Sequence, residues 1–92
     1  MIHRAVVRLS PAEVLGRAKQ FFAERVPNSA AFVEKEGAQF LVLRGQGGEE
    51  VVVSATPGDG GRTQVRASTL MFDQAVDRYL STLPLEGGIE VA

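Results

Sequence analysis

The sequence predicts an α+β fold in which two helices cover one face of a five-stranded antiparallel sheet. Two segments, 11–26 and 69–83, carry apolar residues at the i, i+3, i+4 spacing of amphipathic helices. Five shorter segments alternate apolar and polar side chains and are rich in β-branched residues, as half-buried strands are. Four of these segments follow one another between the helices and are separated by turn-forming residues, which indicates an antiparallel meander.

Length and composition restrict the classes of protein to consider. The chain has 92 residues, 45% of them hydrophobic, and a net charge of −1. We therefore expect one domain, 1–84, followed by a loose C-terminal tail, 85–92, unless residues 89–91 dock. The absence of cysteine excludes disulfides and fits a reducing, cytoplasmic compartment. No apolar run approaches the roughly 18 residues of a membrane span, so we expect no membrane association.

The first strand and the first helix have clear local signals. Residues 2–9 alternate, with Ala5 and Val7 facing the core. Ser10 is a favoured N-cap, Pro11 a favoured first helical residue, and Glu13 completes a capping box. The helix should end at 27–29 and bury one side, which consists of Val14, Leu15, Ala18, Phe21, Phe22 and Val26.

The register of the meander follows from where its turns close. A tight turn at Glu36-Gly37 pairs Val33 with Phe40, and turns at 45–48 and 57–61 close the next two hairpins. The second hairpin then pairs Val42 with Val51, and the third pairs Val53 with Val65. All three registers predict a single inner face, made of Ala31, Val33, Phe40, Val42, Val51, Val53, Val65 and Ala67.

The last helix is expected over 69–83, capped by Thr69 and ended by Pro84. Its buried side should consist of Phe72, Ala75, Val76, Tyr79, Leu80 and Leu83. Asp73 and Asp77 lie on the opposite side, where we expect them to be solvated.

The order strand, helix, four-stranded meander, helix resembles the TATA-binding-protein-like fold group, which includes the START/Bet v 1-like helix-grip domains. The resemblance is one of topology and covers residues 2–83. It implies a sheet order of 1-5-4-3-2 with both helices on one face. In helix-grip members a long C-terminal helix lies over a ligand cavity, and TATA-binding proteins place the uncovered sheet face on DNA.

The residue types argue against catalysis and metal binding. A single histidine, no cysteine and scattered carboxylates do not make a zinc site, and we expect no metal and no cofactor. The glycine-rich segment 45–48 is typical of a turn, since it leads into a strand and a phosphate-binding loop leads into a helix. Segment 58–60 is also typical of a hairpin turn, and the alternative there is a loose contact with Ca²⁺ or Mg²⁺. His3 is the only plausible neutral-pH base, and on the inner face we expect it to be a hydrogen-bonded structural residue. We therefore predict a protein that is not an enzyme.

Three surfaces are candidates for function. An apolar cluster on the uncovered face, which would be a homodimer interface, consists of Phe32, Leu41, Leu43 and Val52. A small apolar ligand could instead lie between helix and sheet against Phe22, Phe40, Phe72 and Tyr79, although these residues could equally fill an ordinary core. A basic rim, which would bind nucleic acid or be solvated, consists of Arg4, Arg8, Arg62 and Arg66. The sequence favours a small interaction module that self-associates through the uncovered sheet face.

Overall fold

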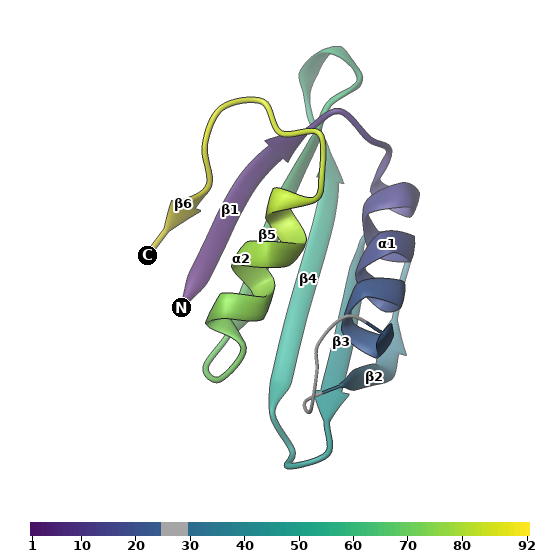
Figure 1. Cartoon of the computed structure of the whole chain (residues 1–92). Coiled ribbons are helices and arrows are strands. Elements are labelled where there is room, and N and C mark those ends of the chain that lie inside the picture. The colour runs from purple at the N-terminus through teal and green to yellow at the C-terminus, as the bar shows by residue number, and fades with distance from the viewer. Residues whose placement is uncertain (25–29) are drawn as a thin grey trace.

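The computed structural model describes residues 1–24 and 30–92 (Figure 1). Val26 and the predicted helix end at 27–29 lie outside these described residues. A 3₁₀ turn, η1 (Asp59–Gly61), lies between β4 and β5. The helices and strands follow in the order β1 (Ile2–Val7), α1 (Pro11–Glu24), β2 (Ala31–Glu36), β3 (Phe40–Gly45), β4 (Glu50–Pro57), β5 (Thr63–Thr69), α2 (Asp73–Ser81) and β6 (Glu90–Val91).

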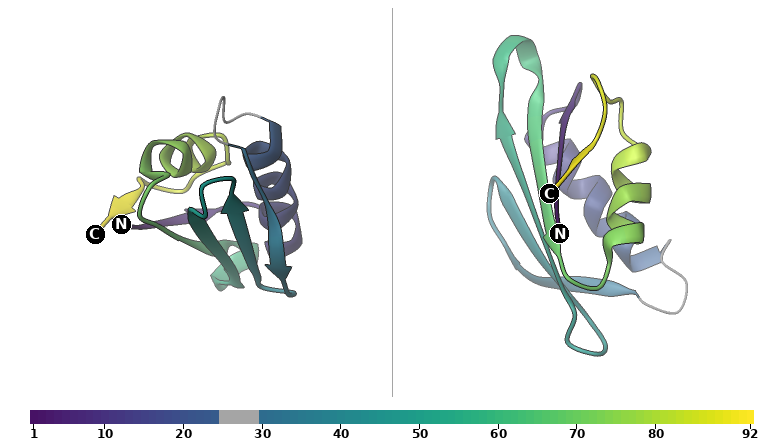
Figure 2. Two further views of the ribbon diagram at one scale, coloured as in Figure 1. Left: turned by 90° about the horizontal axis from the view of Figure 1, so that it is seen from below. Right: turned by 90° about the vertical axis from the view of Figure 1, so that its left-hand side faces the viewer.

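The strands form one six-stranded antiparallel sheet in the order β2-β3-β4-β5-β1-β6. Both helices lie on the same face, α1 over β2, β3 and β4 and α2 over β1 and β5 (Figures 1 and 2). The predicted fold class and the predicted order of the first five strands are therefore confirmed, with a sixth strand added beside β1. Among residues 1–24 and 30–92, no helix lies on the opposite face (Figure 2).

The start of α1 is fixed by the predicted capping box. The hydroxyl oxygen of Ser10 accepts a hydrogen bond from the backbone N–H of Glu13 at 3.2 Å, and the Glu13 carboxylate accepts one from the Ser10 N–H at 3.3 Å. These bonds satisfy N–H groups that a helix start otherwise leaves unpaired. The predicted inner side of α1 is buried wherever the structure describes it.

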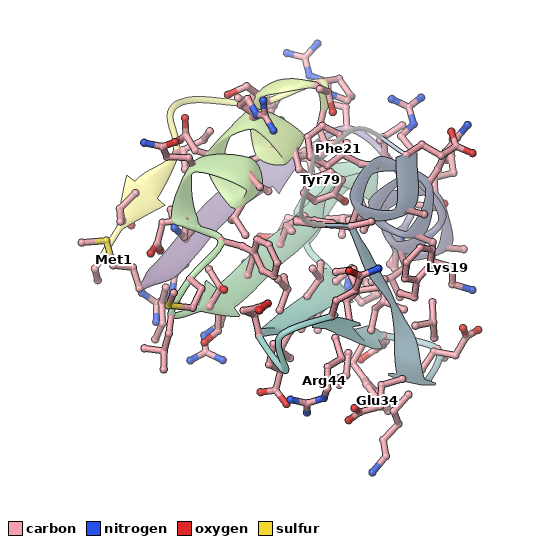
Figure 3. All side chains as sticks on the ribbon, turned by 60° about the horizontal axis from the view of Figure 1, so that its bottom comes forward. Met1, Lys19, Phe21, Glu34, Arg44 and Tyr79 are labelled. Atoms are coloured by element: carbon pink, nitrogen blue, oxygen red, sulfur yellow. The ribbon has the colours of Figure 1, made fainter. Side chains whose placement is uncertain are left out.

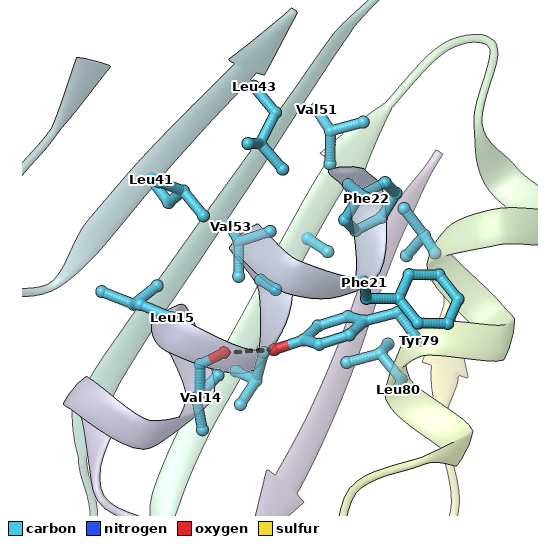
Figure 4. Packing of buried hydrophobic residues seen from close by; sticks show 14 of the residues in the cluster. Val14, Leu15, Phe21, Phe22, Leu41, Leu43, Val51, Val53, Tyr79 and Leu80 are labelled. Atoms are coloured by element: carbon cyan, nitrogen blue, oxygen red, sulfur yellow. Dashed lines mark hydrogen bonds between the residues drawn. The ribbon is translucent and has the colours of Figure 1, made fainter. Parts of the chain in front are cut away.

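The orientation of β3 is the main error of the sequence analysis. Leu41 pairs with Val53 and Val42 pairs with Val52, which is one residue away from the predicted register. Leu41 and Leu43 are consequently 0% exposed and point toward α1 (Figure 4). Phe40 and Val42, which were predicted to be inside, lie on the uncovered face. The prediction failed because the run 40–43 is apolar at every position, so either orientation buries two large side chains.

The turn between β2 and β3 explains the shift. It consists of residues 37–39 and is closed by a 2.9 Å bond from the Gly37 N–H to the Phe40 carbonyl, so the predicted two-residue turn is wrong. A Cβ at Gly37 would lie 2.2 Å from the Phe40 ring, so a larger residue there would require that ring to move. An irregularity between Val33 and Lys35 adds a bulge, and Val33 pairs with Leu43. At the sheet edge Val33 is 42% exposed, so it is not the core residue that was predicted.

The β4–β5 pairing differs from the prediction by two residues, which leaves the faces unchanged. Val53 lies opposite Ala67 instead of Val65, and Ala55 lies opposite Val65. Because side chains alternate with a period of two, the predicted inner residues of both strands are still buried.

The second helix is shorter than predicted. It begins at Asp73, and Thr69 belongs to β5. The Thr69 hydroxyl accepts a hydrogen bond from the Phe72 N–H at 3.1 Å and donates one to the Glu50 carbonyl at 3.0 Å. It therefore joins the turn before α2 to β4 and is not the helix cap. The predicted buried side of α2 is confirmed.

The C-terminal segment is ordered along β1, so the expectation of a loose tail is wrong. The Glu86 N–H donates to the Val6 carbonyl at 2.8 Å, and Leu85 forms a bridge with Val7. Residues 90–91 then form β6 against β1, and Ile89 packs on the core. The stated alternative, docking of residues 89–91, is what occurs.

Candidate functional site

The predicted ligand residues are not gathered around a common site. Tyr79 is 0% exposed, and its hydroxyl donates a 2.6 Å hydrogen bond to the Val14 carbonyl (Figure 4). Its ring lies 5.8 Å from that of Phe22, which in turn lies 6.5 Å from Phe72. Burial raises the pKa of Tyr79. Phe40 lies on the other face of the sheet. The polar group expected to orient a ligand is therefore used inside the core, where the rings pack as an ordinary aromatic cluster.

The single histidine is held by an acidic residue at the start of α2. His3 is 3% exposed, and its Nε2 lies 3.0 Å from the Oδ1 of Asp73. This hydrogen bond holds the pKa of Asp73 below its usual range, and the chain's amino group contributes in the same direction. Within the described residues Nδ1 of His3 has no hydrogen-bond partner. The expected hydrogen-bonded structural role of His3 fits this geometry, whereas the expectation that Asp73 is merely solvated is wrong.

Residues 1–24 and 30–92 contain neither a metal-binding cluster nor a membrane-spanning helix. There, no three or more histidine, cysteine, aspartate or glutamate side chains come together in a way that would hold a metal ion. None of the helices in the same residues has the length and apolar character needed to cross a membrane.

The uncovered sheet face keeps an apolar surface, although with different residues from those predicted. Leu41 and Leu43 lie on the covered face, and Phe40 and Val42 lie on the uncovered face instead. We call the resulting set, Phe32, Phe40, Val42 and Val52, the outer apolar patch. Phe32 is 54% exposed and Phe40 38% exposed, while the two valines are half-buried by their neighbours. Val42 and Val52 lie directly opposite each other at the centre of the patch.

An ionic cluster that the sequence analysis missed borders this patch. Arg44 donates to the carboxylate of Glu50 at 2.8 Å, to that of Glu34 at 3.1 Å, and to the Gly48 carbonyl at 2.8 Å (Figure 3). The hydrogen bond between Glu34 and Arg44 lowers the pKa of Glu34 and raises the pKa of Arg44. The bulge in β2 brings Glu34 toward Arg44, and no periodicity in the sequence indicates a bulge.

The predicted basic rim divides into two unlike pairs. Arg8 donates to Glu86 at 2.8 Å, and Arg62 donates to the other oxygen of the same carboxylate. Arg62, and to a lesser extent Arg8, therefore lower the pKa of Glu86. Arg4 and Arg66 lie directly opposite each other on β1 and β5, and both are exposed. Four arginines acting together on nucleic acid are thus not what the structure presents.

The comparisons with protein-family models, curated proteins and solved structures gave no match. The topological resemblance to the TATA-binding-protein-like group therefore stays a prediction.

Proposed function

We propose that this chain is a non-catalytic interaction module that forms a homodimer through its uncovered sheet face. The observation that carries the proposal is the outer apolar patch, which lies on the sheet face opposite α1 and α2. Contiguous apolar surface of this kind is a feature of interaction sites, whereas isolated exposed apolar residues are not. We also propose a cytoplasmic location, in keeping with a sequence that lacks cysteine.

A second copy fits this face because cross-strand neighbours on it are complementary in kind. Consider a two-fold axis parallel to the strands and passing between β3 and β4. Such an axis places each residue of β3 against the copy of its own cross-strand partner on β4. Val42 then meets the partner's Val52, and Arg44 meets the partner's Glu50, each contact occurring twice. The rotation therefore brings valine onto valine and positive charge onto negative charge, and it places Phe40 against the partner's Ser54.

The size of the overlap determines the expected affinity. The overlap would consist of four strands, β2 to β5, with β3 against the partner's β4 and β2 against the partner's β5. At normal strand spacing and rise it would measure roughly 19 by 20 Å. This is smaller than the approximately 800 Å² per partner of a standard stable interface. We therefore expect a weak dimer, with a Kd in the micromolar range.

A charge exchange tests the arrangement. Arg44→Glu alone and Glu50→Arg alone each place like charges together across the axis and should weaken the dimer about tenfold or more. The double exchange restores opposite charges between positions 44 and 50 across the axis, although it leaves a carboxylate at position 44 beside Glu34, so its Kd should fall back below those of both single variants. Sedimentation velocity measures the three Kd values, and circular dichroism of each variant checks its folding. A double variant that dimerises as weakly as the single variants would contradict this axis.

A second candidate function is binding of single-stranded nucleic acid, which is favoured by the position of Phe40 on the uncovered face. Phe40, Ser54, Arg66 and Arg4 lie side by side across four strands of the uncovered face. An aromatic ring beside arginines is a combination that single-strand binding proteins use. Glu34 and Glu50 on the same face oppose it. Fluorescence anisotropy with a labelled oligonucleotide at low and high salt distinguishes the candidates, because binding to phosphates weakens steeply with salt.

A further inference from the structure

A polar groove lies on the uncovered face beside the outer apolar patch, on the side toward β1. It has a volume of about 470 Å³ and lies between β4, β5, β1 and the segment that leads to β6. This volume falls in the range of small-molecule sites, roughly 300–1,000 Å³. The β4 and β5 side of the groove lies within the overlap proposed for the dimer, whereas its β1 side and the segment leading to β6 lie beyond the partner's β2. The groove is lined by residues that include Arg4, Arg66, Ser54, Gln64, Gly87 and Gly88.

The groove contains two arginines held close together. Thr69 and Met1 exchange backbone hydrogen bonds, so alternation makes Arg4 and Arg66 a non-hydrogen-bonded pair, the type whose Cα atoms lie closest, at about 4.5 Å. Like charges directly opposite each other destabilise a sheet. Within the described residues neither side chain has a carboxylate within ion-pair distance. A bound anion would relieve the repulsion between them.

The surroundings of the two arginines favour an anion. Of the two carboxylates that line the groove, Glu86 is already bound by Arg8 and Arg62. Glu90, opposite Arg4 on β6, is the other. The net charge around the groove is +2, because four arginines (Arg4, Arg66 and the two bound to Glu86) outnumber two glutamates (Glu86 and Glu90).

Neutral donors complete the lining. Gln64 supplies an amide on the floor of the groove, and Ser54 supplies a hydroxyl that donates to the Arg66 carbonyl at 3.5 Å. The N–H groups of Gly87 and Gly88 donate to no backbone acceptor in the described part of the chain. Gly87 has a φ of 83°, a left-handed conformation that glycine adopts without strain.

We propose that this groove binds the phosphate group of a small phosphorylated molecule. The guanidinium groups of Arg4 and Arg66 hold the dianion, and the N–H groups of Gly87 and Gly88 donate to it from the side. The remaining volume accommodates a polar organic body over Ser54 and Gln64. The site does not require the dimer, so it stands apart from the function proposed above.

The test is an NMR titration of the full chain, following backbone amide shifts at constant ionic strength. The probes are orthophosphate and glucose 6-phosphate, with glucose as the uncharged counterpart and chloride as the balancing anion. We expect saturable shifts at residues 4, 66, 87 and 88 with both phosphates and none with glucose. Arg66→Gln should weaken binding about tenfold or more, the loss of about one charge-assisted hydrogen bond. The matched control Arg17→Gln, an exposed arginine on α1, should leave binding unchanged.

Shifts that do not saturate, or that are the same in Arg66→Gln as in the unaltered chain, would overturn the proposal. Arg4→Gln is a second variant at the same pair and should give the same loss if Arg66→Gln fails to fold. The titration is repeated on Val52→Lys, which should be monomeric. Binding that persists there supports a site independent of the dimer, and binding lost there contradicts the independence stated above.

Discussion

At the scale of single residues, burial and not residue type decides the role of the apolar side chains of β3. Leu41 is 0% exposed and Phe40 is 38% exposed, although both are large and they are adjacent in the sequence. The leucine therefore contributes to the stability of the fold. The phenylalanine is available to a partner on the uncovered face.

Truncating these two side chains separates the roles. Leu41→Ala should lower the free energy of unfolding by about 2–5 kcal/mol, because it removes a fully buried side chain and leaves a cavity beneath α1. Phe40→Ala should cost clearly less and should mainly weaken self-association. Urea unfolding gives the first quantity and sedimentation velocity the second. A larger stability loss from Phe40→Ala would mean that the register predicted from the sequence is the correct one.

The buried hydroxyl of Tyr79 gives a second test at this scale. Tyr79→Phe keeps the aromatic packing but removes the 2.6 Å bond to the Val14 carbonyl. The expected loss of stability is about 0.5–1.5 kcal/mol, the usual net value of one hydrogen bond. Chemical denaturation measures it. Unchanged stability would show that the hydroxyl has no structural role and would return Tyr79 to the candidates for ligand binding.

At the scale of elements, two arginines on separate segments fix the C-terminal segment through Glu86. The carboxylate joins Arg8, which follows β1, to Arg62, which precedes β5, and its own N–H bonds to β1. This contact orders the segment that leads to β6. It also makes part of the stability dependent on pH.

The sign of that dependence follows from the lowered pKa of Glu86, whose ordinary value is 4.5. Below 4.5 the unfolded chain binds a proton at this group more readily than the folded chain does, so folding is disfavoured as the pH falls. The contribution is fully present above that value and is lost as the pH drops through the folded pKa. Glu86→Gln should therefore flatten the acid side of the stability curve, as measured by urea midpoints between about pH 3 and 7. Equal slopes in both proteins would contradict the role of this carboxylate.

Periodicity predicted the elements well and the contacts between them less well. The capping box at Ser10 and the one-sided apolar pattern of both helices are local signals, and they located α1 and the buried side of α2. The orientation of β3 was not predictable, since residues 40–43 are apolar on both faces and only the turn at Gly37 selects one. The Arg44 cluster depends on a bulge, and the contact of His3 with Asp73 depends on α2 beginning four residues after Thr69. These features arise from tertiary geometry that spacing in the sequence does not encode.

At the scale of the whole molecule, the fold separates a face that is closed from a face that is open. The closed face is filled by the two helices and by an aromatic core whose only tyrosine is satisfied internally. The open face carries the outer apolar patch, the Arg44 cluster and the paired arginines at different positions across its strands. Proposals about function therefore concern the open face.

Sedimentation equilibrium over a range of concentrations into the high micromolar tests the central claim most directly. The unaltered chain should move from the mass of one 9.9 kDa chain toward that of two as its concentration rises. Val52→Lys, which places a charge at the centre of the outer apolar patch, should remain a monomer throughout. Gln20→Lys, on the exposed side of α1, should dimerise as the unaltered chain does. An unaltered chain that stays monomeric at the highest concentration, or a Val52→Lys variant that still dimerises, would contradict the account.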